Sequence, residues 1–363
     1  MSYKIGLLYG DGIGPEITEA TAKIMKAAVK HCSVDVDFVR YPMGWEAIKE
    51  YGDPLPEYTK EQLKTCDSWV FAPHDSASYP KEHFERANPS GTMRHEFDLF
   101  SNCRPAKTYP GVEKRVNNDA DVLVFRENSE GALPDRNMYW GWGEFMPSED
   151  MVILNSVFTR KATERIAHEA FKMAMKRKKH VTIVHKANVI QKAYGLFKSV
   201  IYEIGKKYYP EVTIDDYHID AMAAHMVKRL KDFDVIVTTN LFGDILSDLA
   251  GELTGSLGLG SAINTNETQC MAQAAHGSAP DIAGQNIANP VGLILSAVMM
   301  LDWLANNRND SKLEDVARVM EDAVLKTMEA GILTPDMGGK ESTTSFAEAV
   351  VREIENEARS VVA

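Results

Sequence analysis

Two aspartates spaced one helical turn apart have the clearest potential for chemistry in this sequence. Asp244 and Asp248 lie in the segment Asn240-Leu-Phe-Gly-Asp-Ile-Leu-Ser-Asp248, and residues four apart project from one face of a helix. Their mutual repulsion is relieved when they share a divalent cation, since Mg²⁺ prefers a few carboxylates together with substrate oxygens and waters. A solvated acidic face is the alternative. The apolar neighbours favour the metal site: Leu241, Phe242, Ile245, Leu246 and Leu249.

Three arginines carry the side chain that best grips carboxylates. Arg94, Arg104 and Arg126 each lie at the edge of an apolar segment. Converging guanidinium groups bind di- and tricarboxylates through paired hydrogen bonds. Taken singly, each arginine is better explained as a surface ion-pair partner, and the sequence does not show that the three converge.

A lysine and a long loop add two candidate features. Lys186, in His185-Lys-Ala-Asn188, directly follows the expected strand 181–185, and desolvation there would lower its pKa into the range of proton transfer. An exposed loop lysine is the better explanation of Lys186 alone. The polar loop from His276 to Pro290 is either a long connection or a nucleotide-binding segment. An aspartate in such a loop repels a 2′-phosphate, which favours NAD over NADP.

The glycine turn near the N-terminus is weak evidence for a dinucleotide fold. Gly10-Asp-Gly-Ile-Gly14 stands between an expected strand and an expected helix, but its spacing is G-x-G-x-G rather than G-x-G-x-x-G. Glycines followed by Pro15 suit any tight connection between a strand and a helix.

Alternating strand-like and helix-like segments predict an α/β fold around these residues. The expected strands are 5–9, 34–41, 68–72, 121–125, 181–185, 213–218 and 234–238. The expected helices are 16–30, 59–65, 159–177, 196–208, 221–231, 291–306 and 313–330. Residues 137–158 combine aromatic residues with glycines, as a projecting hairpin would. We expect this hairpin to pack either on its own chain or on a partner subunit.

The composition excludes several functional classes. The 363 residues are 44% hydrophobic and carry a formal net charge of −12, which argues against nucleic acid as a partner. The four cysteines have no CxxC spacing, so reduced thiols in a cytoplasmic protein are expected. No secretory signal and no membrane span is expected from the N-terminus or from any apolar run.

Together these motifs resemble the β-decarboxylating dehydrogenase family, whose members act on isocitrate, 3-isopropylmalate, homoisocitrate, tartrate and D-malate. The resemblance runs from the glycine turn to Thr334-Pro-Asp-Met-Gly-Gly339 and the following Thr343-Thr344. It implies an isocitrate/isopropylmalate dehydrogenase-like fold of two α/β lobes that share a mixed sheet, not a true Rossmann fold. The large NAD-binding lobe would hold 1–100 and 253–363. The small lobe, 101–252, would carry the metal site, the dimer contacts and the hairpin at about 137–158.

The resemblance also implies a role for each candidate residue. Arg94, Arg104 and Arg126 would bind the substrate carboxylates, and Asp220, Asp244 and Asp248 would hold Mg²⁺ or Mn²⁺. Lys186 would be the base for the hydroxyl proton and Asp220 a second catalytic residue, and both would enter the site of the neighbouring subunit of a homodimer. The NAD-binding residues would be His276, Gly277, Ser278, Ala279, Asp281, Ile282 and Asn289, with Asp281-Ile282 matching the NAD type.

Two features leave the substrate open. The family has a tyrosine that helps to protonate the enolate seven residues after the arginine of Arg126-Glu-Asn128, and this chain has Leu133 there. Tyr139 lies nearby in sequence. The stretch before Arg94 carries Asn88, Ser90 and Thr92, which suit a polar substituent better than an isopropyl group. We therefore expect isocitrate, homoisocitrate or a tartrate-like substrate, with 3-isopropylmalate as the alternative.

Two other functions compete with this prediction. A metal-free Rossmann dehydrogenase for 2-hydroxy acids would release no CO₂, and the three aspartates argue against it. A non-catalytic regulatory subunit of such an enzyme would fit Leu133, and the presence of Lys186 and the aspartates argues against it.

Overall fold

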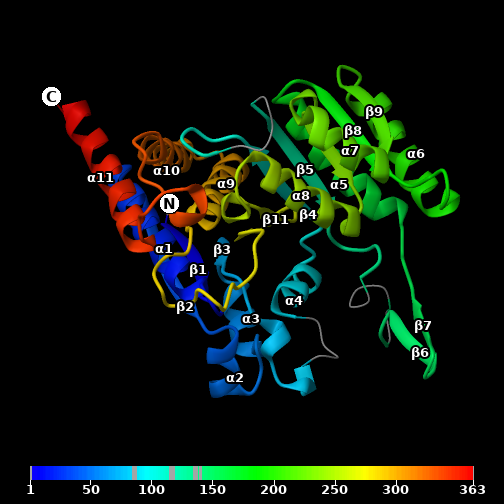
Figure 1. Cartoon of the computed structure of the whole chain (residues 1–363), viewed down its shortest axis with the longest axis horizontal. Coiled ribbons are helices and arrows are strands. Elements are labelled where there is room, and N and C mark those ends of the chain that lie inside the picture. The colour runs from blue at the N-terminus through cyan, green and yellow to red at the C-terminus, as the bar shows by residue number, and fades with distance from the viewer. Residues whose placement is uncertain (1, 84–87, 114–118, 134–137, 139–140, 363) are drawn as a thin grey trace. The chain divides into compact units, whose positions relative to one another are not determined.

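The chain divides into two compact units in a computed structural model that describes residues 2–83, 88–113, 119–133, 138 and 141–362, with the backbone alone for 357–362. One unit holds Met1–Pro89, Tyr109–Glu113 and Gly255–Ala363, and the other holds Ser90–Thr108 and Lys114–Thr254. Each unit contains strands of a mixed sheet with helices packed on them, as Figure 1 shows. The predicted α/β fold class is therefore confirmed.

The first unit arranges its strands in the order β2-β1-β3-β12-β11. These strands are β1 (Ser2–Leu8), β2 (Asp35–Tyr41), β3 (Ser68–Phe71), β11 (Ile263–Thr265) and β12 (Cys270–Gln273). They are parallel except for β11, which runs antiparallel to β12. The helices are α1 (Gly14–His31), α2 (Trp45–Tyr51), α3 (Glu57–Leu63), α9 (Val291–Arg308), α10 (Ser311–Glu329) and α11 (Thr343–Val362). Helix α9 is apolar on nearly all sides because it packs between β3, β12, α1 and α10.

The glycine turn between β1 and α1 lets backbone segments approach closely. Gly10 and Gly12 have φ of 61° and 59°, which only glycine adopts at low cost. A β-carbon at Gly12 would collide with the carbonyl oxygen of Ser278, and that oxygen accepts the Ile13 N–H at 2.8 Å. The turn thus fixes the start of the 276–290 loop.

The second unit arranges its strands in the order β4-β5-β10-β8-β9. They are β4 (Ser101–Lys107), β5 (Asp121–Glu127), β8 (His180–His185), β9 (Thr213–His218) and β10 (Val235–Thr238). All are parallel except β4, which runs antiparallel to β5. The helices are α4 (Pro89–Glu96), α5 (Arg160–Met175), α6 (Gln191–Tyr208), α7 (Ile219–Arg229) and α8 (Asn240–Thr254). The first residue of α4, Pro89, is assigned to the first unit.

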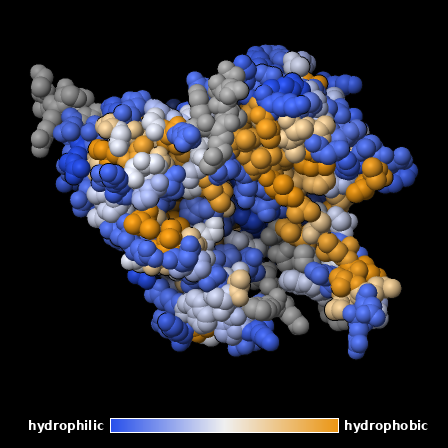
Figure 2. Space-filling model, in the orientation of Figure 1, coloured by the Kyte–Doolittle hydropathy of each residue, from blue (hydrophilic) through white to orange (hydrophobic). Residues whose placement is uncertain are grey.

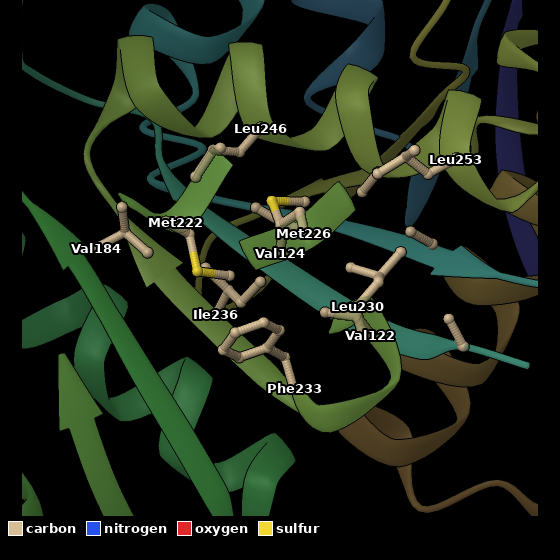
Figure 3. Close-up of a cluster of buried hydrophobic side chains, with 13 residues drawn as sticks. Val122, Val124, Val184, Met222, Met226, Leu230, Phe233, Ile236, Leu246 and Leu253 are labelled. Atoms are coloured by element: carbon tan, nitrogen blue, oxygen red, sulfur yellow. The ribbon is translucent and has the colours of Figure 1, made fainter. Parts of the chain in front are cut away.

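One buried cluster holds α7 and α8 against the strands of this unit, as Figure 3 shows. Successive strand residues face opposite sides of a sheet, so Val122, Val124 and Ile236 reach this cluster. Leu123, Phe125 and Val237 face the other side, where α5 packs on β5 and β10. From the helices, the cluster takes Met222, Met226, Leu246, Ala250 and Leu253.

The predicted hairpin is present as β6 (Glu144–Ser148) and β7 (Met151–Leu154), which pair antiparallel. Every residue of both strands is exposed. Figure 2 shows apolar side chains gathered over it, and these are Phe145, Met146, Met151, Val152, Ile153 and Leu154. Tyr139 and Trp140 of the predicted aromatic segment lie outside the described residues.

No helix in the described ranges is long and apolar enough to cross a membrane. All four cysteines are free thiols, and Cys66, Cys103 and Cys270 are buried.

A buried carboxyl group joins the base of the hairpin to α5. Gly131 and Val157 exchange two backbone hydrogen bonds there. The neighbouring Glu130 accepts the Thr159 N–H at 2.6 Å and its hydroxyl at 2.8 Å, while Thr159 caps α5. Burial, with a contribution from Glu127, raises the pKa of Glu130 to about 7 even though the Thr159 bonds oppose this.

We predict a pH-dependent stability gain in the variant Glu130→Gln. Since the folded pKa of Glu130 is raised, the protonated form favours folding, and its contribution is lost as pH rises from about 4.5 to about 7. The stability of the variant relative to the original chain should therefore increase from pH 5 to pH 8, on the order of 1–3 kcal/mol. Urea unfolding at both pH values measures the difference. The exposed control Glu355→Gln should show no such trend, and an equal trend in both variants would contradict the prediction.

Candidate active site

Two of the predicted arginines and two of the predicted aspartates meet in the second unit, where β5 ends and α8 begins. Arg126 is next to last in β5 and pairs with Asn102 of β4 and Thr238 of β10. Arg104 follows two residues after Asn102. Helix α8 starts at Asn240, directly after β10, and crosses over β4 and β5. Side chains from β4, β5 and α8 are thereby brought together.

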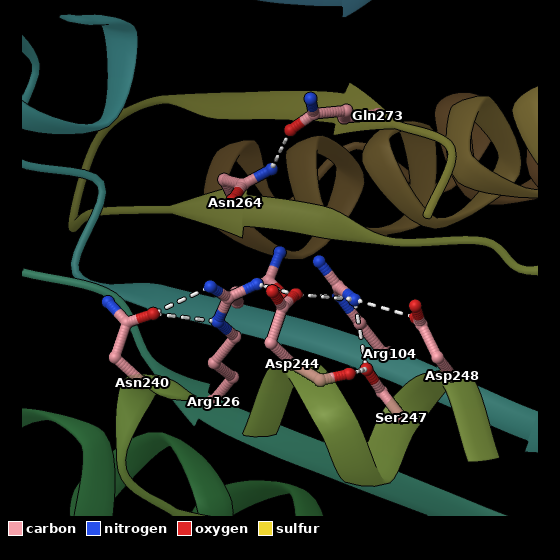
Figure 4. Close-up of polar contacts among 9 residues, drawn as sticks. Arg104, Arg126, Asn240, Asp244, Ser247, Asp248, Asn264 and Gln273 are labelled. Atoms are coloured by element: carbon pink, nitrogen blue, oxygen red, sulfur yellow. Dashed lines mark hydrogen bonds and ion pairs between the residues drawn. The ribbon is translucent and has the colours of Figure 1, made fainter. Parts of the chain in front are cut away.

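Opposite charges alternate in this cluster, which Figure 4 shows. Arg126 forms a close ion pair with Asp244, and Arg104 Nη1 lies 3.3 Å from Oδ1 of both Asp244 and Asp248. The arginine side chains are only 4% and 7% exposed, whereas those of the aspartates are 48% and 52% exposed. The guanidinium groups are therefore desolvated while the carboxylates stay accessible to a ligand.

Three polar residues that the sequence did not single out orient the arginines. Asn240 Oδ1 accepts two hydrogen bonds from Arg126, at 2.9 and 2.6 Å. Asn102 accepts from Arg104 Nε at 2.7 Å, and Ser247 accepts from its Nη1 at 2.9 Å. The Nδ2 of Asn240 is buried and has no hydrogen-bond partner among the described residues. Such an atom points to a ligand or water that completes the site.

Lys186 and Asp220 form a second, separate pair. Strands β8 and β9 run parallel with His185 opposite His218, so the residues that follow them emerge at one edge. Lys186 Nζ donates to Asp220 Oδ1 at 2.6 Å, and this bond lowers the pKa of Asp220. The Asp220 side chain is 69% exposed, so it is free to face a second molecule.

The three aspartates predicted to bind a divalent cation form two separate groups within one chain. Asp244 and Asp248 stand one turn apart on the same helix face, and Asp220 stands on another element. Within the described residues no three metal-ligating side chains come together. Burial and the nearby Asp244 carboxylate raise the pKa of Asp248, against the opposing effect of Arg104 and Arg126. That destabilised negative charge is what a cation would relieve.

The predicted cofactor residues lie in the first unit, on the loop that precedes α9. His276 Nε2 is buried and has no hydrogen-bond partner among the described residues, while burial lowers the pKa of His276. Asn289 donates to Asp336 at 2.9 Å and caps the Val291 N–H at 3.0 Å. Ser278 is buried, whereas Gly277 and Asp281 are exposed and Ala279 and Ile282 are half-buried. The orphaned nitrogen of His276 beside exposed loop groups fits a nucleotide.

The remaining predicted substrate-binding residues lie on α4 or just before it. Arg94 and Ser90 lie on this helix and are each 9% exposed. Asn88 is exposed just before the helix, and Leu133 is half-buried after β5.

Comparison with known proteins identifies the family of this chain. Residues 4–350 match the model of the isocitrate/isopropylmalate dehydrogenase family. The isocitrate/homoisocitrate dehydrogenase of Thermus thermophilus is 38% identical over 357 residues, which cover 98% of this chain and 100% of that protein. The 3-isopropylmalate/3-methylmalate dehydrogenase of Methanocaldococcus jannaschii is 38% identical over 360 residues, with 98% and 100% covered.

A solved structure agrees with the sequence comparison. The isocitrate dehydrogenase of Methylococcus capsulatus superposes with a TM-score of 0.86 at 35% identity, covering 97% of this chain and 99% of that one. The family match and the solved structure define a dehydrogenase of the decarboxylating type. The chain belongs to the isocitrate/isopropylmalate dehydrogenase family, and the resemblance predicted from the motifs is confirmed.

We predict that Gly243→Ala disrupts the charged cluster. A β-carbon at Gly243 would lie 2.6 Å from Arg126 Cβ, so α8 must move away from β5 and carry Asp244 with it. Such overpacking should destabilise the protein by about 1–3 kcal/mol and lower its activity. Gly251→Ala on the same helix is the matched control, because nothing lies within 4 Å of its β-carbon, and it should stabilise by up to about 1 kcal/mol. Urea unfolding measures the stability of both variants. Equal stabilities would contradict the prediction and show that α8 tolerates the displacement.

Proposed function

We propose that this chain catalyses the NAD-dependent, divalent-metal-assisted oxidative decarboxylation of a 3-substituted (2R)-malate-type 2-hydroxy acid. The observation that carries the proposal is the alternating cluster of Arg104, Arg126, Asp244 and Asp248, with the Lys186–Asp220 pair at a neighbouring strand edge. Such a cluster has separate groups for the carboxylates of a substrate and for a cation.

The arginines would bind the substrate carboxylates. Arg104 and Arg126 are desolvated, and Asn102, Ser247 and Asn240 already fix their orientation, so little side-chain entropy remains to be lost on binding. Arg94 on α4 would add a third guanidinium. A carboxylate that binds them must replace Asp244 and Asp248 as the counter-charge.

The released aspartates would then hold a cation with the partner's Asp220. When Mg²⁺ or Mn²⁺ is bound, it supplies Lewis-acid stabilisation of the negative charge that develops on the substrate oxygen. Lys186 Nζ would accept the hydroxyl proton, directly or through water, while the hydride goes to NAD. Asp220, bonded to Lys186, would keep that amine oriented between turnovers.

The nucleotide would lie on the 276–290 loop. His276, with its orphaned Nε2, and Asn289 would bind the adenosine half together with Gly277, Ser278, Ala279, Asp281 and Ile282. Asp281 is exposed, and its carboxylate suits ribose hydroxyls while it repels a 2′-phosphate. This supports NAD rather than NADP.

The polar residues around α4 support isocitrate, homoisocitrate or a tartrate-like substrate. Ser90 and Asn88 are hydrogen-bonding groups, and a pocket for an isopropyl group would gain about 1–3 kcal/mol for each methylene that it buries. The alternative is 3-isopropylmalate. Relatives named for either substrate are similarly close, at 38% identity for isocitrate/homoisocitrate and 34–39% for 3-isopropylmalate, so overall similarity does not choose between them.

Leu133 supports the second alternative, a non-catalytic regulatory subunit. A leucine donates no proton, so in a catalytic chain another group must protonate the enolate that remains after CO₂ leaves. The presence of Lys186 and of the three aspartates favours the catalytic function.

A homodimer with shared active sites is part of the proposal. An isolated two-stranded hairpin is marginally stable in water, and the exposed apolar side chains of β6 and β7 need a surface to cover them. Helices α7 and α8, which carry the two halves of the proposed metal site, also expose Val227, Leu241 and Ile245. A second copy would cover both surfaces and bring Lys186 and Asp220 to Asp244 and Asp248. With a net charge of −12 and four free cysteines, we propose a cytoplasmic enzyme whose partners include no nucleic acid and no membrane.

We predict NADH formation with one polar member of a substrate panel. The panel contains isocitrate, homoisocitrate, 3-isopropylmalate, tartrate and D-malate with Mg²⁺ or Mn²⁺, each repeated with EDTA and with NADP⁺. Chelation should abolish the activity, NADP⁺ should support it poorly, and Lys186→Met should reduce kcat by about 10²-fold or more. Activity that persists in EDTA would favour the metal-free dehydrogenase. Inactivity throughout would favour the regulatory subunit.

We further predict that two inactive variants complement each other. Lys186→Met and Asp244→Asn should each be inactive alone. If the site is shared, mixing them by unfolding and refolding should produce heterodimers with one intact site, and about a quarter of the full activity should return. No recovery, with dimers confirmed by light scattering, would place each active site within one chain.

A further inference from the structure

The ring of His185, directly before Lys186, is almost completely buried and uses both of its nitrogens. It is the last residue of β8 and is 1% exposed. Its Nε2 lies 2.8 Å from Asp216 Oδ2, and its Nδ1 accepts the Ala187 N–H at 3.1 Å. Because a backbone amide only donates, Nδ1 must be unprotonated, so Nε2 carries the proton. The surroundings thus select one tautomer.

Asp216 is held as an anion by three donors. Besides His185, it accepts from Lys198 Nζ at 2.8 Å and from the Tyr202 hydroxyl at 2.7 Å, both on α6. Burial would raise the pKa of Asp216, but the hydrogen bonds outweigh it and lower that pKa to about 2. Burial lowers the pKa of His185; the bond to Asp216 opposes this, and Lys198 and His218 add to it. His185 is therefore neutral and faces the ionised carboxylate of Asp216.

The same geometry fixes the backbone on both sides of Lys186. The Ala187 amide is tied to His185, while the Lys186 carbonyl accepts from Val189 N at 3.2 Å and Ile190 N at 3.0 Å. The backbone that carries Lys186 is thus held on both sides, and from it Nζ reaches Asp220 Oδ1 at 2.6 Å.

We propose that His185 and Asp216 form a positioning pair that holds the Nε2–H tautomer, anchors the Ala187 amide and thereby aims the amine of Lys186. This rests on the proposed catalytic function of Lys186. Neither residue touches the reacting atoms, so both act through Lys186. A misplacement of about 1 Å at such a group lowers kcat by up to about 10²-fold, so the pair should affect kcat far more than KM.

Two substitutions of His185 separate its two hydrogen bonds. His185→Asn places an oxygen near the Nδ1 position and keeps an acceptor for Ala187. His185→Gln places an amide near the Nε2 position, keeps the bond to Asp216 and loses that acceptor. We expect His185→Gln to lower kcat by about 10-fold or more, with KM little changed, and His185→Asn to lower it clearly less. Tyr202→Phe removes a donor from Asp216 without touching His185 and should leave kcat near that of the original chain.

A spectroscopic readout tests the tautomer without activity. In protein labelled with ¹⁵N at its ten histidines, the signals missing from His185→Asn identify His185. They should show a pyridine-type Nδ1 and a pyrrole-type Nε2 that persist over the working pH range, and Asp216→Asn should mix the tautomers. The Ala187 amide should exchange slowly with solvent and faster in His185→Gln.

The outcomes distinguish this inference from the proposed function. If Lys186→Met abolishes activity while the two His185 variants lose kcat equally, or lose only thermal stability, the pair is structural and the inference is overturned. If Lys186→Met leaves activity intact, the proposed function fails. In that case the tautomer and the Ala187 exchange rate still decide whether the anchor exists, and the opposite tautomer would refute it.

Discussion

The structure of the second unit depends on two desolvated guanidinium groups that need counter-charges. A buried charge without a partner costs several kcal/mol, and Arg104 and Arg126 are almost fully buried. Asp244 and Asp248 supply the counter-charges from the exposed side. The arginines are thus fixed and the carboxylates replaceable, which is the arrangement that an anionic substrate with a cation needs. When substrate and cation bind together, the substrate carboxylates would pair with the two arginines and the cation would pair with the two aspartates.

The surrounding helices and strands hold these arginines and aspartates in place. Gly243 lets α8 lie against the backbone of Arg126, and the cluster that includes Met222, Met226 and Leu246 holds α7 and α8 on the strands. Parallel pairing of β8 and β9 delivers Lys186 and Asp220 to one edge. The two groups of residues remain separate within one chain, so a second copy is what the proposed site requires for completion.

The sequence predicted the long periodic elements and the charged residues better than their partners. The strands 213–218 and 181–185 and the helix 291–306 agree with β9, β8 and α9 to within two residues. Strand β4 was not predicted because Pro105 and alternating polar residues interrupt its pattern. Asn240 and Ser247 meet arginines 114 and 143 residues away, and no local pattern encodes such distant hydrogen bonds. Similarly, Asp216 becomes significant only when β9 pairs with β8.

Manganese binding tests the central claim, that the arginine–aspartate cluster accepts a cation and a hydroxydicarboxylate together. Free Mn²⁺ can be measured by electron paramagnetic resonance as the protein is titrated, with and without D-malate as the probe. We predict that Mn²⁺ binds weakly alone, because Asp244 is engaged with Arg126, and at least about 10-fold more tightly with D-malate. Asp244→Asn should abolish that enhancement. Tight binding that neither D-malate nor Asp244→Asn alters would contradict the account.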